Sequence, residues 1–115
     1  MSLINLLPQT IKEELSSKSL LKVIAGLNNF DLQSVKTIVE AASLGGADLV
    51  DIACNPELVD LALQNSSLLV CVSSVVPRYF IDSVKAGASL IEIGNYDTFY
   101  EKGINFSDEK VLNIT

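Results

Sequence analysis

The sequence predicts an α/β fold of four parallel βα units, the content of half a (βα)8 barrel, preceded by an N-terminal helix. The chain has 115 residues, of which 49% are hydrophobic and 19% are charged, which is enough apolar material for the core of one domain. Short runs rich in Val, Ile and Leu alternate with segments whose apolar residues recur at helical spacing. The short runs are almost continuously apolar, which is typical of parallel strands that are buried on both faces.

A helical segment is expected before the first strand. Thr10 and Glu13 have the spacing of a capping box, and a polar stretch follows a few residues later. We therefore divide the chain into a helical lead-in, residues 1–19, and a half-barrel, residues 20–115.

Four apolar runs are expected to form the strands, at residues 20–25, 49–54, 68–72 and 90–93. A helix-start signal follows each run. Asp31 and Asn55 are placed to cap the first two helices, Pro77 opens the third, and Ser107 can cap a fourth. The fourth helix has barely begun at Thr115, so we expect the half-barrel to be truncated within that helix.

An internal repeat supports the βα arrangement. Residues 46–53, GADLVDIA, can be laid over residues 87–94, GASLIEIG, which aligns Asp51 with Glu92. In the third strand, midway between these two residues, Cys71 takes the equivalent position. The repeating unit is one strand plus one helix, which predicts right-handed βα units. A barrel is favoured over a dinucleotide-binding sheet because no Gly-x-Gly-x-x-Gly follows the first strand. A closed barrel takes about 250 residues, so this chain would supply half of one.

Composition excludes several classes of function. The formal net charge is -6 and the eight Lys and Arg form no cluster, so nucleic acids and acidic membranes are not expected as partners. The chain has no His, which excludes Ser-His-Asp and Cys-His arrangements and the common His-containing zinc sites. No apolar run approaches the roughly eighteen residues that a membrane span needs. We expect neither a metal nor a cofactor, and we expect both cysteines to be free thiols.

Polar side chains are expected at the carboxyl ends of the strands, where barrels bind their ligands. The candidate ligand-binding residues are Asn28, Asn55, Ser73, Ser74 and Asn95. Residues of these types also form helix caps and turns, and Asn55 stands where a helix start requires a cap. Capping is therefore the favoured role for Asn55.

Charged residues inside the apolar strands are the candidate catalytic groups. Asp51 and Glu92 occupy the same position of the repeat, and Lys22 shares their parity, so all three should point to one face of the sheet. They could exchange a proton with a substrate, or Lys22 could neutralise the two acids. The alternatives are a structural ion pair inside the barrel and exposure at a strand end. Cys71 shares this parity and Cys54 does not, and without His both are expected to be unreactive buried thiols.

Four strings in the sequence resemble a known family. They are KVIAGLNNFD (22–31), AASLGGADLVDIACNPELV (41–59), VCVSSVVP (70–77) and AGASLIEIGNYDTFYEKG (86–103). In this order they resemble the N-terminal half of the hypothetical chloroplast reading frame twenty-three family, uncharacterised plastid and cyanobacterial proteins that are treated as relatives of TIM-barrel phosphate-sugar epimerases. The resemblance implies a (βα)8 ancestry and a location in the plastid stroma or the cyanobacterial cytoplasm. It implies no reaction, because the family has none assigned.

Two classes of function remain open. The first is a half-barrel that binds a small phosphorylated metabolite at the carboxyl ends of its strands, with catalysis not expected of the 115-residue chain by itself. The resemblance weakens this expectation, since family members continue through four further units and barrels commonly hold phosphate in the loops after strands seven and eight. The second is a non-catalytic structural or interaction fragment whose open sheet edges pair with a second copy or a second half-barrel. A truncated reading frame without function is the third possibility.

Overall fold

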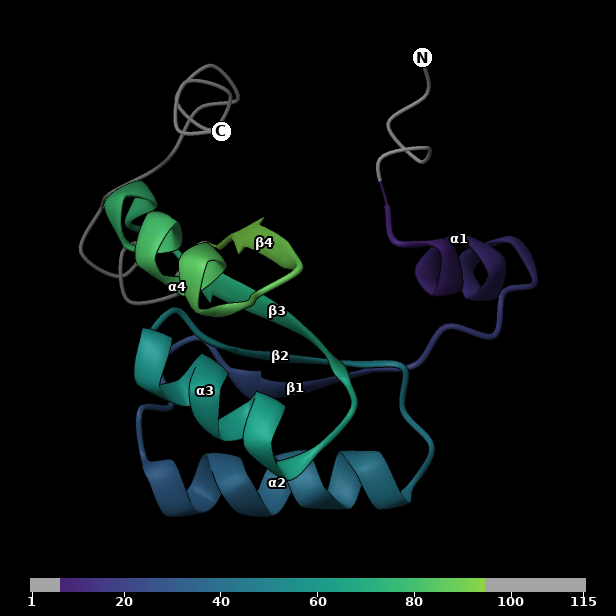
Figure 1. Cartoon of the computed structure of the whole chain (residues 1–115), viewed down its shortest axis with the longest axis horizontal. Coiled ribbons are helices and arrows are strands. Elements are labelled where there is room, and N and C mark those ends of the chain that lie inside the picture. The colour runs from purple at the N-terminus through teal and green to yellow at the C-terminus, as the bar shows by residue number, and fades with distance from the viewer. Residues whose placement is uncertain (1–6, 95–115) are drawn as a thin grey trace, which may run out of the picture.

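The computed structural model describes residues 7–94, which form one parallel sheet with helices (Figure 1). In chain order the elements are α1 (Gln9–Ser16), β1 (Lys22–Gly26), α2 (Leu32–Leu44), β2 (Leu49–Ala53), α3 (Pro56–Asn65), β3 (Leu69–Ser74), the 3-10 turn η2 (Pro77–Tyr79), α4 (Phe80–Ala86) and β4 (Leu90–Ile93). All neighbouring strands are parallel, in the order β1-β2-β3-β4. The predicted α/β class of βα units with an N-terminal helix is confirmed, and the arrangement is consistent with half of an α/β barrel. The fourth helix predicted from Ser107 lies outside the described residues.

Side-chain caps fix the starts of two helices. The carboxylate of Asp31 accepts a hydrogen bond from the Ser34 amide at 2.8 Å, and the Asn55 amide oxygen accepts one from the Glu57 amide at 2.8 Å. Each bond satisfies a backbone donor that has no partner within its helix. Both predicted caps are confirmed.

The predicted start of α1 is wrong by two residues. The helix begins at Gln9, and Thr10 lies in its first turn without capping it. The reason is Pro8, whose φ of -52° already suits a helix and whose carbonyl accepts the first helical hydrogen bond, from the Lys12 amide at 3.0 Å.

Glycine ends α2. Gly46 has a φ of +80°, the Ala47 amide donates to the Ala42 carbonyl at 3.0 Å, and the Gly46 amide donates to the Ser43 carbonyl at 3.3 Å. This is the Schellman arrangement, which satisfies two carbonyls at the end of the helix. It turns the chain directly into β2.

The main core lies between the sheet and α2, α3 and α4, which cover the same face (Figure 1). The largest fully buried apolar side chains are Ile52, Leu58, Val35, Val39, Val50, Val59, Val70 and Val72. They come from the middle strands and from the inner sides of α2 and α3. This core accounts for the apolar residues on one face of the strands. It does not account for those on the other face, which packs differently.

The second face of the sheet is covered only at its amino end. There Ile11 of α1 is buried with Leu49 and Cys71, and the partly buried Leu20, Leu69 and Leu90 pack around them. Towards the carboxyl ends this face is open among the described residues, and Ile24 of β1 is 62% exposed on it. We call this surface the open face. None of the helices in residues 7–94 has the length and the apolar character needed to cross a membrane.

Candidate functional site

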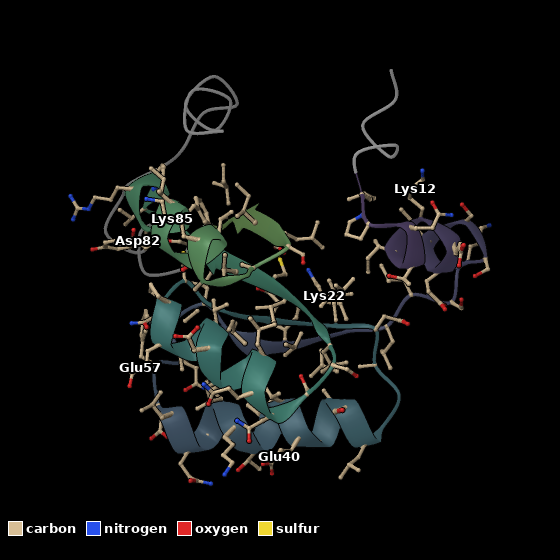
Figure 2. The ribbon with its side chains drawn as sticks, in the orientation of Figure 1. Lys12, Lys22, Glu40, Glu57, Asp82 and Lys85 are labelled. Atoms are coloured by element: carbon tan, nitrogen blue, oxygen red, sulfur yellow. The ribbon has the colours of Figure 1, made fainter. Side chains whose placement is uncertain are left out.

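The three charged residues predicted to share a face meet on the open face. Lys22 begins β1, Asp51 lies in the middle of β2, and Glu92 lies in β4. The Lys22 Nζ is 2.8 Å from Glu92 Oε2 and 3.9 Å from Asp51 Oδ2. In Figure 2 the side chain of Lys22 extends from the sheet toward β4. We call Lys22, Asp51 and Glu92, together with Ser73 and Cys71, the charged cluster.

The strand register places these residues, and it differs in one respect from the repeat. Asp51 lies opposite Cys71, as the repeat predicts. Glu92 lies opposite Ser73, two residues further along β3, and Leu90 takes the place opposite Cys71. A shift of two residues keeps the side chain on the same face, because side chains alternate along a strand. The shared face was therefore predictable although the exact level of Glu92 was not.

Asp51 is the buried member of the charged cluster, with 4% of its surface exposed. The Ser73 hydroxyl donates a hydrogen bond to Asp51 Oδ1 at 2.5 Å. Burial raises the pKa of Asp51, because the charged form loses its hydration, while the Ser73 hydrogen bond and the charge of Lys22 act in the opposite direction. The carboxyl therefore keeps its proton to a higher pH than an exposed aspartate does.

Lys22 and Glu92 form the accessible side of the cluster, with 31% and 48% of their side chains exposed. The hydrogen bond to Glu92 raises the pKa of Lys22, with further support from the negative charges of Glu92 and Asp51. Lys22 is thus held as an ammonium ion and is unsuited to act as a nucleophilic amine. It can instead stabilise negative charge and donate hydrogen bonds.

Cys71 completes the buried side of the cluster. Burial, followed by the negative charge of Asp51, raises the pKa of its thiol to about 12. The Cys71 sulfur and carboxylate oxygens of Asp51 and Glu92 lie within 4.8 Å of one another, a spacing that three metal ligands could have. However, the Lys22 ammonium already lies against the two carboxylates, and a thiol with this pKa keeps its proton. The cluster is therefore better suited to hold the ammonium ion than a metal.

Both cysteines are expected to resist alkylation in the folded chain. Cys71 and Cys54 are free and buried, and burial also raises the pKa of Cys54, which donates a hydrogen bond to Ser83. Only the thiolate reacts, so iodoacetamide at pH 8 should modify either thiol at least about a hundredfold more slowly in the folded chain than in urea. Mass spectrometry of timed samples measures both rates. Modification of Cys71 at equal rates in the two conditions would contradict this assignment.

The predicted ligand-binding residues separate into two groups. Ser73 belongs to the charged cluster. Asn55 is used as a helix cap, Ser74 accepts a hydrogen bond from the Val76 amide at 2.9 Å, and Asn28 is exposed in the turn after β1. None of these three bonds to the charged cluster, and Asn95 lies outside the described residues. A ligand role for them stays a prediction.

A small cavity beside the carboxyl ends was not predicted. It has a volume of about 270 Å³ and is lined by Phe30, Cys54, Asn55, Pro56, Tyr79 and Asp82. Its lining residues lie at the starts of α2, α3 and α4, and the guanidinium of Arg78 stacks 5.1 Å from the Tyr79 ring centre. In the sequence, Phe30 precedes the predicted cap Asp31 and Tyr79 follows Pro77, so both aromatic residues lie near predicted helix starts. Their meeting depends on how the helices pack.

Comparisons with known proteins agree with the resemblance found in the sequence. The model of a family described as "Protein of unknown function (DUF561)" matches residues 6–115. The chain is 39% identical over 110 residues to the uncharacterized protein ycf23 of Antithamnion sp. and 50% identical over 97 residues to that of Cyanophora paradoxa. These matches cover 96% and 82% of this chain and 40% of each relative.

A third relative, the uncharacterized protein ycf23 of Pyropia yezoensis, is 35% identical over 105 residues, or 91% of this chain and 38% of its own length. The chain thus spans about 40% of the length of the curated relatives it matches. These relatives are reading frames of algal plastid genomes. The predicted resemblance to the chloroplast reading frame family is confirmed, and the chain belongs to the DUF561 family of proteins of unknown function.

Proposed function

We propose that this chain forms half of a TIM-type (βα)8 barrel and binds a small polyhydroxylated metabolite on its open face, where Asp51 exchanges a proton with the bound molecule. The observation that carries the proposal is the position of the Lys22 ammonium between carboxylates from two other strands on that face. The length of the relatives supports the barrel, because it leaves room for further βα units. The algal plastid relatives support a location in the plastid stroma, or in the cytoplasm of a cyanobacterium.

The proposed roles follow from burial and charge. Asp51 is buried and its pKa is raised, which suits a group that takes and returns a proton. Lys22 uses one hydrogen bond, to Glu92, so its remaining N–H groups can donate to an oxygen of the metabolite. Glu92 is half exposed and can accept a hydrogen bond from a hydroxyl group.

The same charges restrict how a phosphorylated sugar would bind. The charged cluster contains two carboxylates and one ammonium ion, so it favours hydroxyl and carbonyl groups over a phosphate. A phosphate would lie towards the carboxyl-end loops, which is its usual place in barrels. The sugar part, and not the phosphate, would contact Asp51.

Proton exchange with the solvent tests the proposal directly. The chain is incubated in D2O with pentose 5-phosphates, and NMR measures the exchange of the C–H next to the carbonyl group, with calorimetry for binding. Asp51→Asn is expected to slow the exchange by at least about a hundredfold, because an amide cannot take the proton, with a smaller loss of binding. Glu92→Gln is expected to weaken binding more than exchange.

Two exposed residues provide matched controls for these substitutions. Asp60→Asn on α3 and Glu40→Gln on α2 remove the same charges away from the open face and should leave binding and exchange unchanged. The proposal fails if the parent chain binds none of the sugars, or if Asp51→Asn exchanges protons as fast as the parent.

A further inference from the structure

The two edges of the sheet are features that the proposed function does not use. Within residues 7–94, β1 and β4 each pair on one side only, and both run in the same direction. An open edge presents backbone N–H and C=O groups to a further strand. We propose that a second copy of this chain closes the sheet, with β4 of each copy pairing in parallel with β1 of the other.

Strand direction and strand number both fit this closure. A twofold axis parallel to the strands keeps all strands parallel, so the order β1-β2-β3-β4 continues into β1 of the second copy. The described residues of two copies then supply eight strands, the number in a closed parallel (βα)8 barrel. The contact joins two different edges, and it forms a closed ring after two copies instead of a filament.

Opposite charges on the two edges give the pairing its specificity. Lys22 lies on β1 and Glu92 lies on β4, and within one copy the Lys22 side chain reaches across two strands to meet Glu92 at 2.8 Å. In the register that we propose, β4 pairs with β1 of the other copy so that Glu92 lies beside Lys22 of that copy, and each Lys22 exchanges its partner within the copy for the equivalent carboxylate of the second copy. Each of the two equivalent contacts then contains one ammonium ion and one carboxylate, which is the complementarity that selects a partner.

Apolar surface flanks both edges as well. Ile24 of β1 is 62% exposed on the open face, and Ile91 of β4 is 46% exposed on the other face. A groove of about 300 Å³ runs beside β1 and is lined chiefly by Leu21, Val23, Ile38 and Ala42. Parallel sheets are normally covered on both faces, and closure by a second copy would remove much of this surface from water.

Sedimentation equilibrium of the 115-residue chain at micromolar concentration is the first test. The expected species has twice the 12.4 kDa mass of one chain. A monomer would overturn the proposal and would leave the open face to another part of a longer polypeptide. A ladder of larger species would also overturn it, because it would show that the contact does not close.

Charge reversal tests the pairing itself. Lys22→Glu and Glu92→Lys should each weaken self-association by at least about tenfold, because each places like charges at both contacts. An equimolar mixture of the two variants should restore dimers. In the mixed dimer, one contact joins the unchanged Glu92 of the Lys22→Glu variant to the unchanged Lys22 of the Glu92→Lys variant. The other contact joins the two substituted side chains, which also have opposite charges.

The mixture separates contacts between copies from contacts within a copy. The Lys22–Glu92 pair inside each variant chain remains mismatched, so restoration can come only from contacts between copies. Undiminished dimers in the single variants, or no restoration in the mixture, would overturn the proposal.

A substitution outside the ion pair tests the same contact in case the charge variants fail to fold. Ile24→Lys changes an exposed side chain of a single copy and should leave its far-UV circular dichroism unchanged, while weakening the dimer by at least about tenfold. Leu63→Lys is the matched control and should leave the dimer intact. Leu63 is an exposed residue of α3, and this helix lies between α2 and α4, away from both edges of the sheet. Equal dimerisation of the two lysine variants would contradict the proposed contact.

Discussion

Replacing Ile52 by alanine is expected to lower the free energy of unfolding by about 3 kcal/mol. Ile52 is fully buried in β2, a strand paired on both sides, and its side chain belongs to the main core under the helices. The loss combines the transfer of the removed methyl and methylene groups with the cavity left behind. Since the sheet is tightly hydrogen-bonded on both sides of Ile52, the surroundings can collapse only partly into that cavity.

Urea unfolding followed by far-UV circular dichroism measures this loss, because the chain has no Trp for fluorescence. Ile81→Ala is the matched control. Ile81 lies on α4 and is 62% exposed, so the same substitution should cost less than about 0.5 kcal/mol. Equal losses at the two positions would contradict the core described above.

Replacing Lys22 by methionine is expected to lower the free energy of unfolding by about 2 kcal/mol at pH 7. The substitution leaves the buried carboxylate of Asp51 and the nearby carboxylate of Glu92 without a cation. A fully buried pair would lose more, but Lys22 and Glu92 are partly exposed and solvent reduces their interaction. The Lys22→Met substitution should also abolish the binding of any metabolite to the open face.

The pH dependence of the Lys22→Met effect has a definite sign. Burial raises the pKa of Asp51 above its ordinary value of 3.8, and Lys22 offsets part of that rise, so the attraction between the two charges is present above the raised pKa and is lost as acid protonates Asp51. The hydrogen bond to Glu92 raises the pKa of Lys22 itself above 10.5, so the contribution persists below that pH and disappears as the ammonium ion loses its proton at higher pH. The difference between parent and variant should therefore be largest from neutral pH up to about pH 10.

Urea unfolding at pH 3 and at pH 7 tests this prediction. Lys36→Met is the control, because Lys36 is an exposed residue of α2 whose nearest carboxylate, Glu40, is 3.9 Å away. Its effect should stay below about 0.5 kcal/mol at both pH values. A Lys22→Met effect that is the same at pH 3 and pH 7 would mean that packing, and not charge, explains the loss.

Much of the fold could be predicted because local patterns and tertiary packing agree. The apolar runs became strands, and Asp31 and Asn55 cap the helices for which their positions suited them. The parity of Lys22, Asp51 and Glu92 also followed from alternation along the strands. These features depend on neighbouring residues in the sequence, which is the information that a single sequence contains.

The rest of the site depends on how separate strands are aligned. Ser73 has the same parity as Asp51, but its hydrogen bond to that carboxylate requires the register between β2 and β3. The meeting of Phe30 and Tyr79 around one cavity requires the relative positions of two helices. Such distances arise from packing between elements, and no periodicity within one element contains them.

The register step at Glu92 bears on how such a protein can change over generations. Glu92 lies two residues further along than the repeat predicts and still points to the open face, because a displacement by an even number of residues preserves the face to which each side chain of β4 points. A displacement by one residue would instead turn Glu92 toward the helices and Ile91 or Ile93 toward the cluster. A change in the loop between α4 and β4 that shifts the strand by one residue should therefore abolish the Lys22–Glu92 ion pair, whereas a shift by two residues should keep Glu92 on the open face.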